Sequence, residues 1–256
     1  MRLSAIAFTV CCSVLPVGVY AESGTQNVAE NNVVESPVTP APDSTGTVTD
    51  IDGNVYKTVK IGDQWWMAEN LKVTHYRNGD PVPHVTDRRK WGGLETGAYC
   101  NYGNDEGNVA VYGRLYNWYV VNDSRNIAPE HWRVPSVDDW QILIDYLGRD
   151  SVAGGKLKEV GTTHWSPPNE GATNESGFTA LPGGYRSRRA STLSDDFEDL
   201  GADTYIWSST EHDGFSTGKA IPSAAWCWSL HYFLSRVNDN HHTKRYGYSV
   251  RCVRNY

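Results

Sequence analysis

Alternating polar and apolar residues open the folded part of the chain. Residues 48–51 and 55–61 alternate in polarity around Asp52-Gly53-Asn54, a sequence typical of a tight turn that needs a positive φ. This pattern predicts a β-hairpin. The spacing of acidic residues near the turn also resembles the start of a calcium-binding loop. The later ligands and the closing Glu of such a loop are missing, however, so we expect a turn and no calcium site.

Apolar residues at three- and four-residue spacing predict two helices further along the chain. The first, with an aromatic face, is expected from about Val111 to Asn122. The second begins at Ser136, an N-cap residue with Asp139 three residues later, and ends at Gly148. Beyond it, short apolar runs alternate with segments rich in Gly, Pro and Asn. Two helices among many short strands predict an α+β fold.

The N-terminal residues predict export. Apolar and small residues run from Leu3 to Val19, and Val19 and Ala21 fit the −3 and −1 positions of a signal-peptidase site. We therefore expect a signal peptide over residues 1–21. Two alternatives stay open. One is a transmembrane anchor, for which the apolar run is short. The other is lipid attachment at the adjacent cysteines of this run, which lack a small residue before them.

Composition then divides the rest of the chain. Residues 22–47 are rich in Ser, Thr, Pro, Asn and acidic residues, which predicts a disordered linker. Residues 48–256 have a length that commonly folds as one domain. The formal net charge of −7, with scattered basic residues, argues against binding of nucleic acid. We expect a secreted, periplasmic or cell-surface protein with no membrane span after signal cleavage.

A series of motifs follows in order along residues 48–256: Asp50–Tyr56, Trp66–Leu71, Tyr112-Gly113 with Leu115–Tyr119, Trp132–Ser136, Gly171–Asn174 with Ser176–Phe178, Ala180–Gly184 and Ser249–Val253. Together these segments resemble the Fibrobacter succinogenes major paralogous domain, a secreted bacterial family. More distantly, residues 133–140 and the C-terminal strand resemble the formylglycine-generating branch of C-type-lectin-like folds. The resemblance implies a C-type-lectin-like domain with two helices, small twisted antiparallel sheets and long irregular loops.

The sequence contains little that supports an enzymatic function. The distant relatives bind copper through two cysteines near the final strand, and these positions match Gly247 and Cys252 here, so one thiolate is missing. His241 and His242 are adjacent, and neighbouring side chains of an extended segment point to opposite faces. We therefore expect no catalytic residue, no metal site and no cofactor. An enzyme of unknown activity on the same fold is the alternative.

The resemblance also bears on the three cysteines that follow the signal peptide. Members of the family usually carry a cysteine where this chain has Ala128, whereas Cys227 stands where none is expected. We therefore expect a disulfide between Cys227 and Cys252 and a free thiol at Cys100. The alternative is that all three cysteines are reduced and buried.

The aromatic content favours binding. The chain has 10 tryptophans, and we expect most of them, such as Trp118 and Trp140 on helix faces, in the core. The candidate ligand-binding residues lie in expected exposed loops or share one face of an expected strand: Trp91, Trp165, Tyr185, Trp226 and Trp228. Aromatic rings beside polar residues suit sugar rings. We expect a noncatalytic module for an extracellular glycan or protein. A structural surface domain without a small ligand is a further alternative.

Overall fold

The structure, a computed structural model, describes residues 44–187, 196–212, 215–216, 219–220 and 223–255. The expected signal peptide and most of the expected linker lie outside these residues. The α-helices are α1 (Arg88–Gly92), α2 (Val109–Tyr112), α3 (Trp118–Val121), α4 (Val137–Tyr146) and α5 (Asp150–Leu157), and two short 3-10 helices are η2 (Tyr102–Asn104) and η3 (Glu106–Asn108). No helix in the described ranges is long and apolar enough to cross a membrane.

The first large sheet joins the two ends of the described chain. Its strand order is β1-β2-β3-β14-β6, formed by β1 (Thr45–Thr49), β2 (Val55–Ile61), β3 (Gln64–Met67), β14 (Val253–Arg254) and β6 (Trp132–Arg133). The expected hairpin is present as β1 and β2, and β1 includes residues that we expected in the linker. The Asp50 carboxylate accepts backbone hydrogen bonds from Asp52 and Asn54 and so organises the turn.

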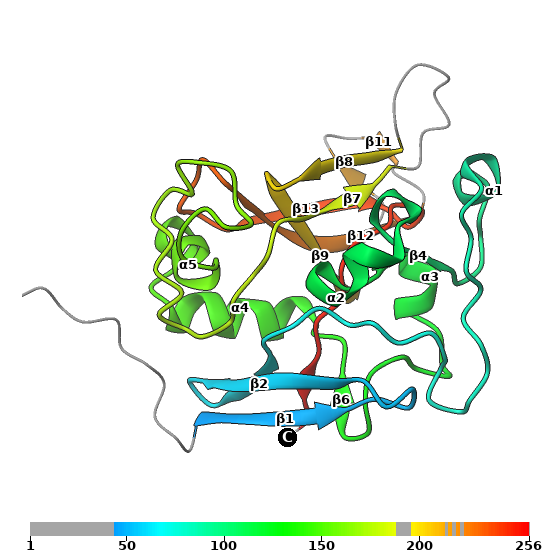
Figure 1. Ribbon diagram of the computed structural model, residues 1–256, viewed down its shortest axis with the longest axis horizontal. Helices are drawn as coiled ribbons and strands as arrows, with labels where there is room; N and C mark the ends of the chain where they lie inside the picture. Colours follow the sequence, from blue (N-terminus) through cyan, green and yellow to red (C-terminus); the bar gives the residue numbers. More distant parts are fainter. Residues whose placement is uncertain (1–43, 188–195, 213–214, 217–218, 221–222, 256) are drawn as a thin grey trace, which may run out of the picture. The chain divides into compact units, whose positions relative to one another are not determined.

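The second large sheet carries most of the C-terminal half. Its strand order is β13-β12-β9-β7-β8, and the pairs are antiparallel except for β7 with β9 (Figure 1). Two further pairs of short strands are β4 with β5 and β10 with β11. The remaining strand bounds are β4 (Tyr99–Cys100), β5 (Leu115–Tyr116), β7 (Gly183–Arg186), β8 (Phe197–Leu200), β9 (Asp203–Glu211), β10 (Phe215–Ser216), β11 (Lys219–Ala220), β12 (Ala224–His231) and β13 (Asn238–Thr243).

Helix α4 packs against both large sheets. Ser136 and Asp139 form the expected capping box at its start, which satisfies backbone N–H groups that have no partner within the helix. The Trp140 ring lies 5.1 Å from the Trp66 ring of β3 and 5.7 Å from the Trp228 ring of β12. One buried indole therefore connects the two sheets, and the fold is α+β.

The helix expected over residues 111–122 is not continuous, so this prediction is wrong. The segment forms α2, then β5, then α3. Gly113, with a φ of 74°, ends α2, and a Cβ at this position would lie 2.7 Å from the Cβ of Asn70. Pairing of β5 with β4 then takes the chain away from helical geometry. Long-range contacts thus override the local aromatic periodicity.

Buried cations tie loops to the sheets. Lys158, which follows α5, is fully buried, and its ammonium donates hydrogen bonds to the carbonyl oxygens of Glu170, His231 and Leu234 at 2.9–3.0 Å. The Arg251 guanidinium, also buried, donates to the Asn70 side chain and to carbonyl oxygens of the loop before β7. Charged groups are rarely buried without such partners, so these loops have a fixed arrangement.

Candidate functional site

Aromatic and imidazole rings gather on one face of the second sheet. Strands β7, β9, β12 and β13, with the segment after β13, supply them. We call this surface the tyrosine–histidine face and define it by five partly exposed residues: Tyr185, Tyr205, His231, His242 and Tyr246. Side chains on alternate residues of a strand share a face, and the strand order brings these rings together.

The rings of this face contact one another. Tyr185 lies edge-on to Tyr205 at 5.1 Å between ring centroids, and Tyr246 stacks on His242 at 5.3 Å. Beneath them, the buried Tyr248 ring is stacked on Tyr205 at 5.0 Å, and its hydroxyl hydrogen-bonds to His242 Nδ1. The buried ring supports the partly exposed ones, so the face is ordered before any ligand arrives.

Polar groups lie at the same face. The Tyr185 hydroxyl donates to Glu198 Oε2 at 2.8 Å, and burial, followed by this carboxylate, raises the pKa of Tyr185 so that the hydroxyl keeps its proton. Across the part of the chain that the structure describes, no hydrogen bond engages the hydroxyls of Tyr205 and Tyr246. Ring surfaces beside unengaged hydroxyls and a carboxylate can stack on a ligand and also hydrogen-bond to it.

Carboxylates border the tyrosine–histidine face. Asp199 follows Glu198 on β8, and Asp203 begins β9. Burial, and then the like charges of Asp203 and Glu198, raise the pKa of Asp199. This border is therefore electronegative and disfavours acidic ligands.

A hydrogen-bonded chain of Ser229, His231 and Asp203 lies at the edge of this face. His231 Nδ1 donates to Asp203 Oδ2 at 2.8 Å, which leaves Nε2 to accept from the Ser229 hydroxyl at 3.0 Å. In a serine hydrolase, the nucleophilic serine, the histidine base and the aspartate that orients it are hydrogen-bonded in the same order. However, Ser229 is 0% exposed, and its oxygen also accepts a hydrogen bond from Asn240 Nδ2 at 2.9 Å. The chain therefore orients His231 and presents no nucleophile to a substrate.

We expect acid to destabilise this part of the fold through His242. Burial, and then the neighbouring His241, lower the pKa of His242 from 6.5 to about 4. The unfolded chain binds this proton near pH 6.5 and the folded chain only near pH 4. The free energy of unfolding should therefore fall between these pH values, by at most about 3 kcal/mol from this group.

Urea unfolding at several pH values checks this expectation. The variant His242→Gln, which cannot take up the proton, should show a smaller loss of stability between pH 6.5 and pH 4 than the unaltered chain. An exposed histidine, His131, provides a matched control, because His131→Gln should leave the pH dependence unchanged. Equal slopes for the unaltered chain and His242→Gln would contradict the assignment.

Two of the candidate ligand-binding tryptophans are buried, which corrects the expectation that they are exposed. Trp91 and Trp165 are each 1% exposed, and their indole N–H groups donate to the carbonyl oxygens of Arg245 and Ala180. Trp165 lies in a loop, as expected, whereas Trp91 lies on α1 and not in a loop. Packing against distant parts of the chain buries them instead, so neither ring is available for stacking on a sugar.

The other three candidates lie on two faces of the second sheet. Tyr185 belongs to the tyrosine–histidine face. Trp226 and Trp228 share the opposite face of β12, as their spacing predicts, and they pair with His241 and Asp239 across β13. Trp228 is 7% exposed, whereas Trp226 is partly exposed. The structure thus does not bring the five candidates together.

Histidines of β13 follow the expected alternation. His241 lies against Trp226, and its ring is stacked on His212 at 4.1 Å, whereas His242 contacts Tyr246 and Tyr248 on the other face. Within the described ranges, no group of three or more His, Cys, Asp or Glu side chains is placed to hold a metal ion.

The expected disulfide between Cys227 and Cys252 is not formed in the structure, where both residues and Cys100 are free, buried thiols. Cys227 lies on β12 between β9 and β13, whereas Cys252 precedes β14 in the other large sheet. Burial raises the pKa of all three thiols, so they stay protonated at neutral pH. They act as small apolar side chains of the core.

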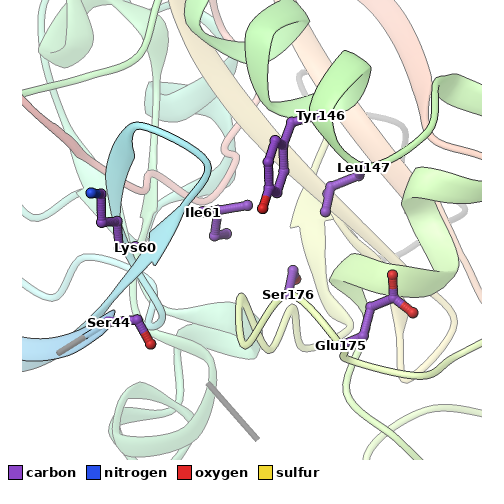
Figure 2. A pocket seen from close by; sticks show the side chains of 7 residues that line it. All are labelled: Ser44, Lys60, Ile61, Tyr146, Leu147, Glu175 and Ser176. Atoms are coloured by element: carbon purple, nitrogen blue, oxygen red, sulfur yellow. The ribbon is translucent and has the colours of Figure 1, made fainter. Parts of the chain in front are cut away.

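A cavity of about 340 Å³ lies between β2, the end of α4 and the loop that follows α5. Tyr146 and Leu147 extend toward Ile61 of β2, while the Lys60 ammonium points away from them (Figure 2). Glu175 at its rim already pairs with Lys156 at 2.6 Å. The Ser176 hydroxyl likewise already donates to the Lys156 carbonyl oxygen. With these polar groups engaged, the tyrosine–histidine face is the better candidate site.

Sequence reasoning missed Tyr205 and Tyr246. A signal for Tyr205 exists in the sequence, since Asp203, Tyr205 and Trp207 alternate with other residues along one strand and so share a face. Its neighbours Tyr185 and Tyr248 come from distant segments, and nothing local indicates that they meet.

Comparison with known proteins identifies the family of this chain. A sequence model described as the Fibrobacter succinogenes major domain matches residues 59–254, which include all five described α-helices and every strand of the second sheet. Comparisons with curated proteins and with solved structures gave no match. With the greater part of its length matched, the chain belongs to the Fibrobacter succinogenes major domain family.

Proposed function

We propose that this protein is an exported, noncatalytic binding module that takes a glycan on its tyrosine–histidine face. The observation that carries the proposal is the group of partly exposed tyrosines, two of whose hydroxyls have no hydrogen bond to any residue that the structure describes, supported from below by Tyr248. Sugar rings present C–H groups that pack on aromatic faces and hydroxyls that need hydrogen-bond partners. The acidic border favours neutral over acidic glycans.

The proposed scaffold is C-type-lectin-like. Three features support it: a capped helix between two sheets, irregular loops, and the pairing of the C-terminal strand β14 with β3 near the start of the domain. We also propose that the domain acts outside the cytoplasm, in the secreted, periplasmic or cell-surface form that the N-terminal sequence predicts. Loops held by a rigid scaffold commonly carry the recognition surface of such modules.

A glycan array with the full exported chain tests the proposal. For a neutral glycan that binds, Tyr205→Ala should weaken the affinity about tenfold or more, because a stacking ring commonly accounts for one or more kcal/mol. Tyr205→Phe retains the ring and should lose only the contribution of the hydroxyl. Tyr146→Ala is the matched control, since this tyrosine is 65% exposed on α4.

The outcomes separate the alternatives. Unchanged affinity for Tyr205→Ala, with the fold intact, would place the glycan site elsewhere. If no glycan binds and one protein partner is captured specifically through the same residues, the ligand of this face is a protein and not a glycan. Turnover of a glycan by the purified chain would replace both binding proposals by an enzyme.

A further inference from the structure

Strand β1 forms an open edge of the first large sheet. Among the described residues, β2 is the only strand that pairs with β1, and the three threonines of β1 are exposed (Figure 1). The other outer strands of the two large sheets carry charged residues, which discourage pairing with a further strand: Arg133 of β6, Glu198 and Asp199 of β8, and Asp239 of β13. Strand β1 contains only Thr, Gly and Val, so neither a charge nor a proline blocks its edge.

The backbone hydrogen bonds of the hairpin show which groups of β1 face outward. Thr47 is directly opposite Lys57, but the Lys57 carbonyl oxygen accepts a hydrogen bond from the N–H of Ala68, on the other side of β2. Residues of antiparallel strands alternate between bonding to a neighbouring strand and pointing away from it. The N–H and C=O groups of Thr47, and with them those of Thr45 and Thr49, therefore point to the open edge.

These open groups are complementary to those of a second copy of the same strand. If two copies run antiparallel about a two-fold axis at Thr47, the two Thr47 residues are opposite each other, and Thr45 of each copy is opposite Thr49 of the other. Each outward-facing N–H then meets an outward-facing C=O. A shift by one residue would instead oppose these groups to residues that already bond to β2. The threonine side chains share one face and form cross-strand pairs, which stabilise antiparallel sheets.

We propose that this edge binds a second copy of the chain, so that the two first sheets join through antiparallel pairing of β1 with β1. A two-fold contact uses the same surface on both copies and closes on itself, which gives a dimer and not a fibre. Five residues from each copy make a small interface, so we expect a dissociation constant of roughly 10–500 µM. The dimer carries two tyrosine–histidine faces, which could hold a repeating glycan at two points. Only this last consequence depends on the proposed function.

Sedimentation equilibrium of the full exported chain at increasing concentration tests the proposal. The unaltered chain should change from monomer to dimer. Thr47→Pro removes one N–H of the open edge in each copy and should weaken the dimer about tenfold or more, whereas the single chain should tolerate a proline at an edge whose N–H faces solvent. Thr47→Ala retains this N–H and is the matched control, so it should dimerise about as well as the unaltered chain.

Introduced cysteines test the register of the pairing. The native thiols Cys100, Cys227 and Cys252 are buried, so mild oxidation should link only the introduced ones. Thr47→Cys should give a disulfide-linked dimer, because directly opposite Cα atoms are about 5.5 Å apart, within the range of a disulfide. Thr49→Cys alone should not, since its two copies would lie about 13 Å apart along the strands. A mixture of Thr49→Cys with Thr45→Cys should link again.

Three results would overturn the proposal, and none of them bears on glycan binding. One is a chain that stays monomeric at about 1 mM, above the expected dissociation constant. This holds even if β1 captures an extended peptide from another protein, because the occupant is then a partner strand and not a second copy. Another is a dimer that Thr47→Pro leaves unchanged, which would place the contact elsewhere. The third is equal cross-linking of Thr47→Cys and Thr49→Cys.

Discussion

Replacing Lys158 by Met should lower the free energy of unfolding by about 3–5 kcal/mol. Burial lowers the pKa of Lys158 to about 8, which still leaves the amine charged at pH 7, so that it can donate all three of its hydrogens. The variant would leave the three accepting carbonyl oxygens without their donor, and losing one side of a buried polar interaction costs about this much. Urea unfolding followed by tryptophan fluorescence measures the change.

Lys156, two residues earlier, is the matched control for this prediction. Its ammonium pairs with Glu175 at 2.6 Å, but both side chains are about a third or more exposed. Exposed pairs contribute about 0–1 kcal/mol, so Lys156→Met should have a small effect. A similar loss of stability for Lys156→Met and Lys158→Met would show that the hydrogen bonds of the buried Lys158 ammonium do not stabilise the fold as the structure indicates.

Replacing Trp91 by Ala should also cost about 3–5 kcal/mol, because a fully buried large side chain would leave a cavity. The Arg186 guanidinium lies over the Trp91 ring at 4.6 Å and would lose that contact too. The exposed Tyr146 again serves as control, and Tyr146→Ala should change the stability by less than about 1 kcal/mol. If Trp91→Ala unfolded at the same urea concentration as the unaltered chain, the burial of Trp91 would be wrong.

Elements governed by local chemistry were predictable from the sequence. The turn at Gly53 and the helix that begins at Ser136 depend on residues a few positions apart, and both are present. The helix expected at residues 111–122 failed because Gly113 approaches Asn70, which lies far away in the sequence. The α+β class followed from the predicted elements, whereas the strand order of the two sheets did not.

The candidate site was predictable only in part. Tyr185 was identified as an aromatic residue near a loop, and it does lie on the tyrosine–histidine face. Trp91 and Trp165 have similar local sequences but are buried, since burial depends on which distant segments cover a residue. Tyr205 and Tyr246 meet Tyr185 only through the strand order of the second sheet. Recognition of the family, in contrast, rests on ordered motifs and needed no tertiary contact.

The position of β14 has a consequence for how the chain reaches its native state. This strand, from the last residues of the described chain, lies between β3 and β6, and Val253 pairs with both Trp66 and Arg133. The first sheet therefore cannot close until β14 has been synthesised, and pairings so distant in sequence form slowly. Until β14 emerges, β3 and β6 both lack this neighbouring strand, and their unpaired edges remain open to pairing with other chains.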